Sequence, residues 1–439
     1  MSVQPLTIAR KHFAAANGEL QVGGLPVSEL AKRYGTPAFI YDRAVLDKKL
    51  DELRRALPSR FSIYYSVKAN PNEAVLRHFL SRGCGMEIAS VGEFRAALTA
   101  GCDPENILFA GPGKTEHELE EVLSHAVGEI HAESLTEIRR LGAIGRRLGI
   151  FPRVALRVNP AAAGEGGAMR MGGRPTPFGV DEESLEEALD EILRDSVIEF
   201  SGIHLFAGTQ ILDAATLVAQ YRHGLDIARR VVAKVGHPLL TVDFGGGLGI
   251  PYFAQEEELD LSVVRTGLQS LFLEIEQTGE FEGTRFLVEP GRFLAGEAGV
   301  YLARVIDIKV SRGKKFLILD GGMNHHLAAS GNLGQTIKRN YPVAIANRID
   351  VAGEETVDVV GPLCTPLDTL ARNVLLPRSE IGDLFVIFQS GAYGLTASPT
   401  EFLGHPAPPE VWTDNGKHSL VRPRGTPMPA IPGSLTAHD

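Results

Sequence analysis

Residues 61–99 read FSIYYSVKANPNEAVLRHFLSRGCGMEIASVGEFRAALT, and this stretch decides the fold. Two short apolar runs, FSIYYSV (61–67) and GMEIA (85–89), have the length and bounds of buried β-strands. Each run is followed by a stretch with apolar residues at three- and four-residue spacings, which is typical of an amphipathic helix. The sequence therefore predicts a strand followed by a helix, and then the same unit again.

The same alternation continues along the chain as far as residue 295. Six further strands are predicted, at 107–110, 129–132, 153–158, 200–206, 239–244 and 285–289. Eight strands separated by helices is the number that a (β/α)8 barrel needs. An open, doubly wound sheet is the alternative that the same pattern allows. The Gly-, Pro- and Ala-rich residues 160–180 interrupt the alternation, and there we predict a long loop rather than an element.

The pattern of apolar and polar residues changes after residue 295. Segments such as GVYLARVIDIKVS (299–311) and DLFVIFQSG (383–391) are β-rich and separated by turn residues, with little helical periodicity. We expect a barrel domain over 36–295 and a second, mostly antiparallel β domain formed by 1–35 and 296–439.

The composition narrows the class of protein. Of 439 residues, 44% are hydrophobic and 22% are charged, which is ordinary for a globular chain. The net charge of -10 argues against a nucleic-acid partner. The N-terminal segment has no signal-peptide pattern, and no apolar run is long enough to span a bilayer, so we expect a cytoplasmic protein without a membrane partner. Three cysteines make neither a disulfide framework nor a zinc pattern, and no metal is expected.

Polar or glycine residues occur at the end of every predicted barrel strand. Active sites of barrels lie at the carboxyl ends of the strands, so these positions are candidates for chemistry. They are Lys68, Glu87, Gly111, Glu133, Asn159, His204, Gly245 and Glu289.

Three of these positions together indicate a cofactor. The amine of Lys68 can form a Schiff base with an aldehyde, although a lysine extending from the barrel mouth is the plainer alternative. The run Gly245–Gly247 and the following Gly291 and Arg292 suit a phosphate, although a glycine run also makes a tight turn. Glu289 can face a heterocyclic nitrogen or simply pair with Arg292. Aldehyde, phosphate and ring nitrogen are the three features of pyridoxal 5'-phosphate.

The motifs that carry these residues resemble one enzyme family from end to end. YYSVKANPN (64–72), GIHLFAGTQ (202–210), DFGGGLGIPY (243–252), EPGRFL (289–294) and GPLCTPLD (361–368) occur in the order of the fold-type III pyridoxal-phosphate decarboxylases, the group of diaminopimelate and ornithine decarboxylases. The resemblance implies an alanine-racemase-like barrel with a β domain. It also implies a homodimer with shared active sites, in which the partner subunit donates the cysteine motif.

The resemblance also implies roles for individual residues. Lys68 corresponds to the Schiff-base lysine, Glu289 to the carboxylate that protonates the pyridine nitrogen, and Cys364 to the cysteine that reprotonates the carbanion. Tyr393 corresponds to a tyrosine that reaches the cofactor from the second domain. From the residues alone, Cys364 remains open to a role in the core, and Tyr393 to packing of a turn. The other implied cofactor positions are Glu87, Arg157, His204, Thr209, Gly245, Gly246, Gly247, Gly291 and Arg292.

Three departures from the family pattern concern ring stacking and the substrate. Phe206 stands where the family has the histidine that stacks on the cofactor ring. Thr365 follows the cysteine in place of an acid, and Asp368 remains nearby as a candidate substrate contact or a structural residue. Residues 321–342 replace the family's Arg-Pro-x-Leu-Tyr segment. This variant pattern resembles a subgroup with an L-glutamyl-carrier-protein decarboxylase and the exosortase-associated decarboxylases.

We therefore predict pyridoxal-phosphate-dependent decarboxylation of an amino acid, either free or carried as a glutamyl-type group on an acyl carrier protein. The alternative is meso-diaminopimelate decarboxylation. An amino-acid racemase is less favoured, because racemases of this fold place an arginine against the pyridine nitrogen, where this chain has Glu289. A non-catalytic cofactor-binding barrel is also less favoured, because such barrels lack a C-terminal β domain.

Overall fold

The computed structural model of the chain describes residues 5–161, 167–170, 175–206, 208–253 and 255–426. The chain divides into two compact units. One comprises residues 49–250 and 257–294, and the other comprises residues 1–48, 251–256 and 295–439. Each unit is described by itself.

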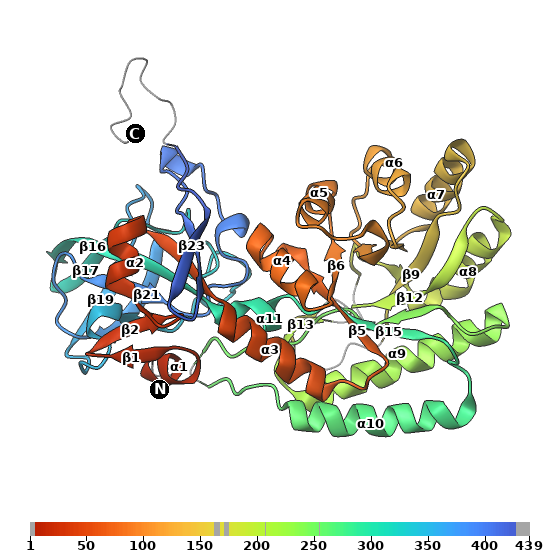
Figure 1. The fold of residues 1–439 in the computed structure, drawn as a ribbon, viewed down its shortest axis with the longest axis horizontal. Helices are drawn as coiled ribbons and strands as arrows, with labels where there is room; N and C mark the ends of the chain where they lie inside the picture. Colours follow the sequence, from red (N-terminus) through yellow and green to blue (C-terminus); the bar gives the residue numbers. More distant parts are fainter. Residues whose placement is uncertain (1–4, 162–166, 171–174, 207, 254, 427–439) are drawn as a thin grey trace, which may run out of the picture. The chain divides into compact units, whose positions relative to one another are not determined.

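The first unit is a closed barrel of eight parallel strands (Figure 1). Each strand pairs with the next along the chain, and the last pairs with the first through Phe286 and Phe61. This closure confirms the barrel and excludes the open sheet. The strands are β5 (Phe61–Ser66), β6 (Gly85–Ile88), β7 (Ile107–Phe109), β8 (Glu129–Ala132), β9 (Arg153–Asn159), β12 (Glu199–Leu205), β14 (Thr241–Asp243) and β15 (Arg285–Val288).

Helices alternate with these strands, and local sequence sets their ends. Asn72, Ser90 and Ser134 each cap a helix N-terminus through a side-chain oxygen, and Thr115 forms a capping box with Glu118. The helices are α3 (Arg43–Ala56), which begins in the second unit, then α4 (Glu73–Ser81), α5 (Val91–Thr99), α6 (Glu116–Ser124), α7 (Leu135–Leu148), α8 (Leu185–Arg194), α9 (Ala214–Val235), α10 (Leu261–Thr278) and the short α11 (Arg292–Ala295). Apolar side chains such as Tyr64, Leu108 and Leu287 fill the barrel as one buried cluster.

The long loop predicted over residues 160–180 is partly wrong. Within it, β10 (Gly167–Arg170) pairs antiparallel with β13 (Gly208–Ile211), and β11 (Val180–Asp181) extends the barrel sheet alongside β9. A ribbon of this kind satisfies backbone groups that a free loop would leave to water. Residues 162–166 and 171–174 of the predicted loop lie outside the described residues.

The second unit is built around a mixed, mostly antiparallel sheet in the order β20-β19-β17-β16-β4-β22-β23, with β21 pairing β16 and β18. Its strands are β4 (Ala38–Asp42), β16 (Gly299–Ser311), β17 (Lys314–Leu319), β18 (Val343–Ile345), β19 (Glu355–Val360), β20 (Thr369–Leu376), β21 (Leu384–Ile387), β22 (Glu410–Asp414) and β23 (Lys417–Arg422). The N-terminal segment adds α1 (Pro5–His12), α2 (Val27–Tyr34) and a small sheet of β1 (Ala14–Ala16), β2 (Glu19–Val22) and β3 (Leu25–Pro26).

Strand β4 lies at the junction that the sequence placed at residue 36. It pairs antiparallel with β16 and parallel with β22, so residues 38–42 belong to the β sheet and not to the barrel. All five residues of β4 are buried, which makes it a central strand of that sheet. Among the described residues, no helix combines the length and apolar character that a membrane crossing requires.

Candidate active site

Lys68 lies directly after the first barrel strand, in a single 3-10 turn (Val67–Ala69). Its Nζ is 2.9 Å from both carboxylate oxygens of Glu87, at the end of the neighbouring strand β6. The Lys68 side chain is 44% exposed, whereas that of Glu87 is 1% exposed. Ser66 also hydrogen-bonds to Glu87 and so helps to fix it. The amine is thus held at one point but remains accessible.

The glycine run after β14 forms a bend that no larger residue fits. Gly245 and Gly247 have φ values of 68° and 104°, in the left-handed region that favours glycine. A Cβ on Gly246 would lie 2.7 Å from the carbonyl oxygen of Glu289, and one on Gly245 would lie 3.1 Å from the ring of Phe206. The run is therefore a tightly packed bend of backbone with Phe206 beside it.

Glu289 follows β15 and is buried, 5% exposed. His204, at the end of β12, donates Nε2–H to Glu289 Oε2 at 3.2 Å. Burial, together with smaller contributions from neighbouring His131 and Arg157, lowers the pKa of His204 well below its usual range, so this imidazole is neutral. A neutral imidazole thus positions the carboxylate of Glu289.

Arg157 is held by a second buried carboxylate. Its Nη1 donates to Glu133 Oε1 at 2.7 Å, and the same carboxylate accepts from the backbone N–H groups of Gly111 and Gly179. Burial alone would raise the pKa of Glu133, but the charges of Arg157 and Lys114 lower it below its usual range. The result is a rigid ion pair at the carboxyl ends of β8 and β9.

The other predicted phosphate residues lie at neighbouring strand ends. Thr209 lies in β13, half-buried, and Arg292 opens α11 directly after β15. A Cβ on Gly291 would lie 2.8 Å from that of Ala69, so glycine is needed where this segment passes the turn that carries Lys68. The barrel unit therefore brings together the carboxyl ends of the strands that carry every predicted barrel residue.

Cys364, Thr365 and Asp368 share one loop of the second unit, between β19 and β20. Cys364 is exposed, whereas the other two cysteines, Cys84 and Cys102, are buried, so its thiol is not part of the core. Asp368 is buried, and its two oxygens accept from the backbone N–H groups of Met323 and Leu363. The Thr365 hydroxyl accepts from the N–H of Leu367 at 3.3 Å.

Tyr393 lies in the tight GAYG segment of the second unit. Its φ of 54° is rare for a residue with a bulky side chain, and such strain is typical of functional positions. A Cβ on Gly391, two residues before it, would lie 1.9 Å from the carbonyl oxygen of Ala295, so the backbone is packed tightly there. The Tyr393 side chain is half-buried.

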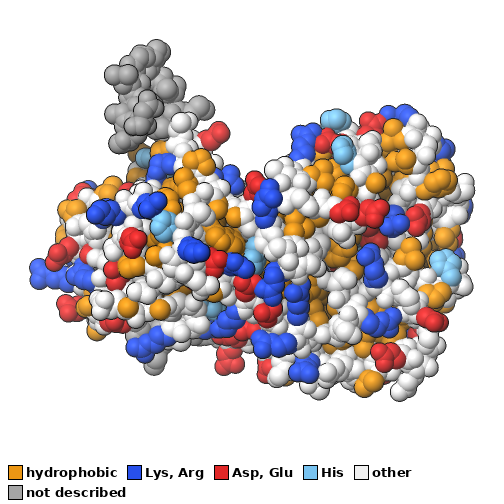
Figure 2. Space-filling model, in the orientation of Figure 1, with side chains coloured by type: hydrophobic (Ala, Val, Ile, Leu, Met, Phe, Trp, Pro, Cys, Tyr) orange, Lys and Arg blue, Asp and Glu red, His pale blue; other side chains and the backbone are white. Residues whose placement is uncertain are grey.

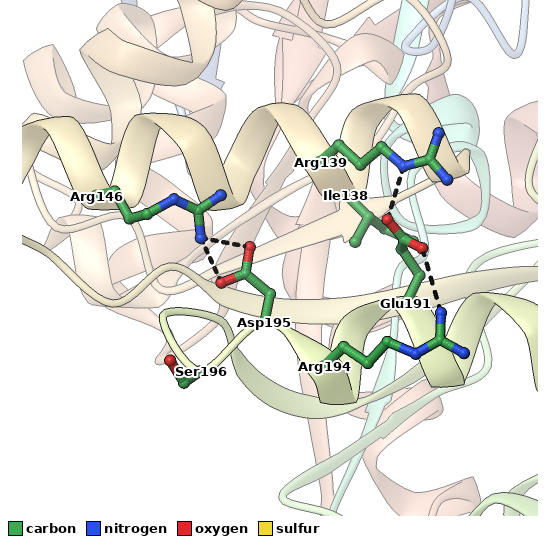
Figure 3. Close-up of a pocket in the computed structure, with 7 residues that line it drawn as sticks. All are labelled: Ile138, Arg139, Arg146, Glu191, Arg194, Asp195 and Ser196. Atoms are coloured by element: carbon green, nitrogen blue, oxygen red, sulfur yellow. Dashed lines mark hydrogen bonds and ion pairs between the residues drawn. The ribbon is translucent and has the colours of Figure 1, made fainter.

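The surface pocket in Figure 3 is a separate feature, between α7 and α8. Arg139 contacts Glu191 at 2.6 Å, and Arg146 contacts Asp195 at the same distance, so these charges compensate one another. Basic and acidic side chains are likewise interspersed over the face shown in Figure 2. None of the predicted site residues lines this pocket, and we do not assign it a function.

The sequence was compared with known families and proteins. Residues 43–296 match the pyridoxal-binding domain of the pyridoxal-dependent decarboxylases. The chain belongs to this family. It is 37% identical over 403 residues to the L-glutamyl-[BtrI acyl-carrier protein] decarboxylase of Niallia circulans, covering 91% of this chain and 94% of that protein. It is 33% identical over 418 residues to a diaminopimelate decarboxylase of Zymomonas mobilis, covering 94% and 96%.

Solved structures agree with this assignment. A diaminopimelate decarboxylase from M. jannaschii in complex with L-lysine superimposes with a TM-score of 0.86 at 25% identity, over 94% of this chain and 95% of that chain. The protein is therefore a pyridoxal-phosphate-dependent decarboxylase with an alanine-racemase-like barrel.

The barrel residues fit pyridoxal phosphate. Lys68 offers an accessible amine, and Glu289 offers a buried carboxylate to a ring nitrogen. The bend at Gly245–Gly247 is the candidate phosphate cradle, because its positive φ values at Gly245 and Gly247 require glycine. Phe206, beside the cradle, offers a flat apolar surface to the ring. These are the groups that the aldehyde, phosphate and pyridine of this cofactor require.

The sequence analysis missed the polar residues inside the barrel. Glu133 was noted at a strand end without a role, and His131 and Asp243 were counted as parts of apolar strands. A histidine within EIHA and an aspartate directly before the glycine run were the available signals, since ionisable residues are rarely buried without partners.

Proposed function

We propose that this enzyme decarboxylates a glutamyl-type amino acid carried as a thioester on an acyl carrier protein. Pyridoxal phosphate, when bound, supplies an electron sink that accepts the electron pair left on Cα as carbon dioxide departs. The family membership establishes this chemistry, and the proposal concerns the substrate and the roles of individual residues.

The barrel residues take the following roles in this proposal. Lys68 would bind the cofactor covalently, and Glu87 holds the Lys68 amine in place. Glu289 would keep the ring nitrogen protonated, which a full electron sink needs. Backbone N–H groups of the glycine run, with Thr209 and Arg292, would bind the phosphate, and Phe206 would pack against the ring.

The observation that carries the substrate proposal is the environment of Asp368. Both of its oxygens accept backbone N–H groups, and burial raises the pKa of its carboxyl. Thr365, beside Cys364, is neutral. A substrate with a distal ammonium group needs a carboxylate partner, because an unpaired buried charge costs several kcal/mol. This loop offers no available carboxylate among the residues from 361 to 368, so it suits a substrate whose distal end is neutral or extended.

The proposal includes a cytoplasmic homodimer with shared active sites. Cys364 acts as the proton donor to Cα, and its exposure on a loop of the second unit supports a role toward another subunit. Tyr393 would be a further cofactor residue.

The second candidate is meso-diaminopimelate decarboxylation, which the identity to diaminopimelate decarboxylases supports. Carbon dioxide release from purified enzyme tests both, with free amino acids, meso-diaminopimelate and glutamyl thioesters of a carrier protein as substrates. We expect release from the thioester and little from free diamino acids. Release from meso-diaminopimelate alone would reject the proposal in favour of the second candidate.

A further inference from the structure

A cluster of ionisable side chains lies inside the barrel next to Glu289. Its other members are Glu129 and His131 on β8, His204 on β12 and Asp243 on β14. All five are at most 5% exposed. Buried ionisable groups at such density are costly unless protons and hydrogen bonds are shared among them.

The histidines connect the carboxyl groups. His131 donates Nε2–H to Glu129 Oε1 at 3.1 Å, and its Nδ1 is 3.8 Å from Glu289 Oε1. The rings of His131 and His204 stack with centroids 4.3 Å apart at an interplanar angle of 19°. Thr241 donates its hydroxyl to the second oxygen of Glu129 at 2.7 Å.

Asp243 and Glu289 are the two carboxyl groups of the cluster whose hydrogen bonds require a shared proton. Its Oδ1 accepts the backbone N–H of Gly245 at 2.7 Å. Its Oδ2 and Glu289 Oε1 are both buried acceptors without a donor among the described residues, and the two side chains lie within one cluster of ligand atoms no more than 4.8 Å apart. One proton on Asp243 satisfies both oxygens, because the acid donates and the carboxylate accepts.

The electrostatics agree with this assignment. Burial and the neighbouring charge of Glu289 raise the pKa of Asp243 well above its usual range. Glu129 behaves differently: burial opposes its ionisation, but the contacts with His131 and Thr241 lower its pKa. More distant charges that act on the cluster through His204 are those of Arg157, Glu133 and Glu87.

We propose that Asp243 is a positioning residue that keeps a proton and donates it in a hydrogen bond to Glu289. Together with the N–H of His204, this bond orients the Glu289 carboxylate, whose remaining lone pairs face the pyridine nitrogen. No step of the reaction moves this proton. The inference rests on the assignment of Glu289 as the partner of the ring nitrogen, and its primary test needs no cofactor.

Infrared spectroscopy of the cofactor-free protein near neutral pH tests the proposal. The carbonyl band of a protonated carboxyl group should be present in the wild type and absent in Asp243→Asn. It should be unchanged in Asp260→Asn, an exposed aspartate at the N-terminus of α10. In Glu289→Gln the band should shift without loss, since Asp243 keeps its proton but has a new partner.

A second measurement separates positioning from a purely structural role. In the loaded enzyme, Asp243→Asn should keep the absorbance of lysine-bound cofactor and the KM, while kcat falls about 10- to 100-fold, the range for one hydrogen bond to a charged group. Identical infrared spectra for the wild type and both cluster variants would overturn the proposal. A stoichiometric divalent metal ion bound by His131, His204, Asp243 and Glu289 in the purified protein would also overturn it, because the ion would replace the proton. An unchanged kcat in Asp243→Asn would overturn it as well. The infrared band could be lost in Asp243→Asn while the wild-type enzyme decarboxylates none of the substrates tried. That result would reject the proposed substrate and leave the protonation of Asp243 standing.

Discussion

Asp368 accepts the N–H of Met323 on one carboxylate oxygen at 2.7 Å and the N–H of Leu363 on the other at 2.9 Å. Residues 321–342, which the sequence is expected to carry in place of the family's Arg-Pro-x-Leu-Tyr segment, are thereby hydrogen-bonded to the loop of Cys364. A Cβ on Gly322 would lie 2.3 Å from the same carboxylate, so the contact is close as well as hydrogen-bonded. The Asp368 carboxylate joins two loops through these hydrogen bonds, and it is therefore less available to pair with an ammonium group of a substrate.

Lys68→Ala should abolish the visible absorbance of lysine-bound cofactor and trapping by borohydride, because no amine remains at this position. Decarboxylation should fall by several orders of magnitude, as is usual when a covalent residue is removed. The control is Lys234→Ala, whose amine is paired with Asp190 on the outer helices. Retention of borohydride-trapped cofactor in Lys68→Ala would show that another lysine binds it.

Gly247→Ala should weaken binding of pyridoxal phosphate about tenfold or more, since strain at a left-handed position costs about 1–3 kcal/mol and a Cβ would lie 2.9 Å from the carbonyl oxygen of Gly208. Gly236→Ala is a matched control, because Gly236 also has positive φ but a Cβ there would meet nothing within 4 Å. Titration of the cofactor-free proteins measures both. Equal affinities in the two variants would exclude the glycine run as the cradle.

Cys364→Ala should still bind the cofactor and release carbon dioxide, but reprotonation of the product should slow, with part of the cofactor converted to its amine form. If the thiol serves the partner's site, mixing Cys364→Ala with Lys68→Ala should restore part of the activity through hybrid dimers. Cys102→Ser, at a buried cysteine, is the control substitution. Subunit exchange without any recovery would contradict a shared site.

Glu133→Gln should make the free energy of unfolding less dependent on pH in the acid range. Because the folded pKa of Glu133 is below its unfolded value of about 4.5, the ion pair stabilises the protein above that pH, and this stabilisation is lost as pH falls through the folded pKa. At about pH 7 the variant should be less stable by about 3–5 kcal/mol, the cost of breaking a buried pair. Urea unfolding at about pH 7 and about pH 4 measures the difference.

At about pH 4 the difference in free energy of unfolding between the wild type and Glu133→Gln should be smaller than at about pH 7. The exposed Glu276 of α10 gives a control, since Glu276→Gln should leave the pH dependence of stability unchanged. A gap of the same size at both pH values would contradict the assigned role of Arg157.

The barrel could be predicted because its strands carry a strong signal. The apolar runs at 61–67 and 285–289 differ from the observed strands by only one residue, at the C-terminal end of each strand. Strand β4 was not separated from the barrel, because a buried strand has the same apolar pattern whichever sheet it joins. The pairing of β10 with β13 was missed because Gly- and Ala-rich segments carry no periodicity.

The candidate site was predictable where chemistry follows a strand end, and not where it lies within a strand. Lys68, Glu289 and the glycine run stand at such ends. His131 lies inside an apolar strand, and the three-dimensional closure of the barrel brings it to Glu289. Asp243 was counted within the predicted apolar strand 239–244, although it ends β14 beside β15. The use of Asp368 likewise depends on a contact with residue 323, which is 45 positions away in the sequence.

We propose that the described loop of Cys364, residues 361–368, offers no available carboxylate to a distal ammonium group. The most direct test is the ratio of kcat/KM for a glutamyl thioester on an acyl carrier protein to kcat/KM for meso-diaminopimelate, measured with the same enzyme preparation. We predict a ratio well above one, because a site without a paired carboxylate discriminates against a buried cation. A kcat/KM for meso-diaminopimelate above that for every glutamyl derivative would contradict the account.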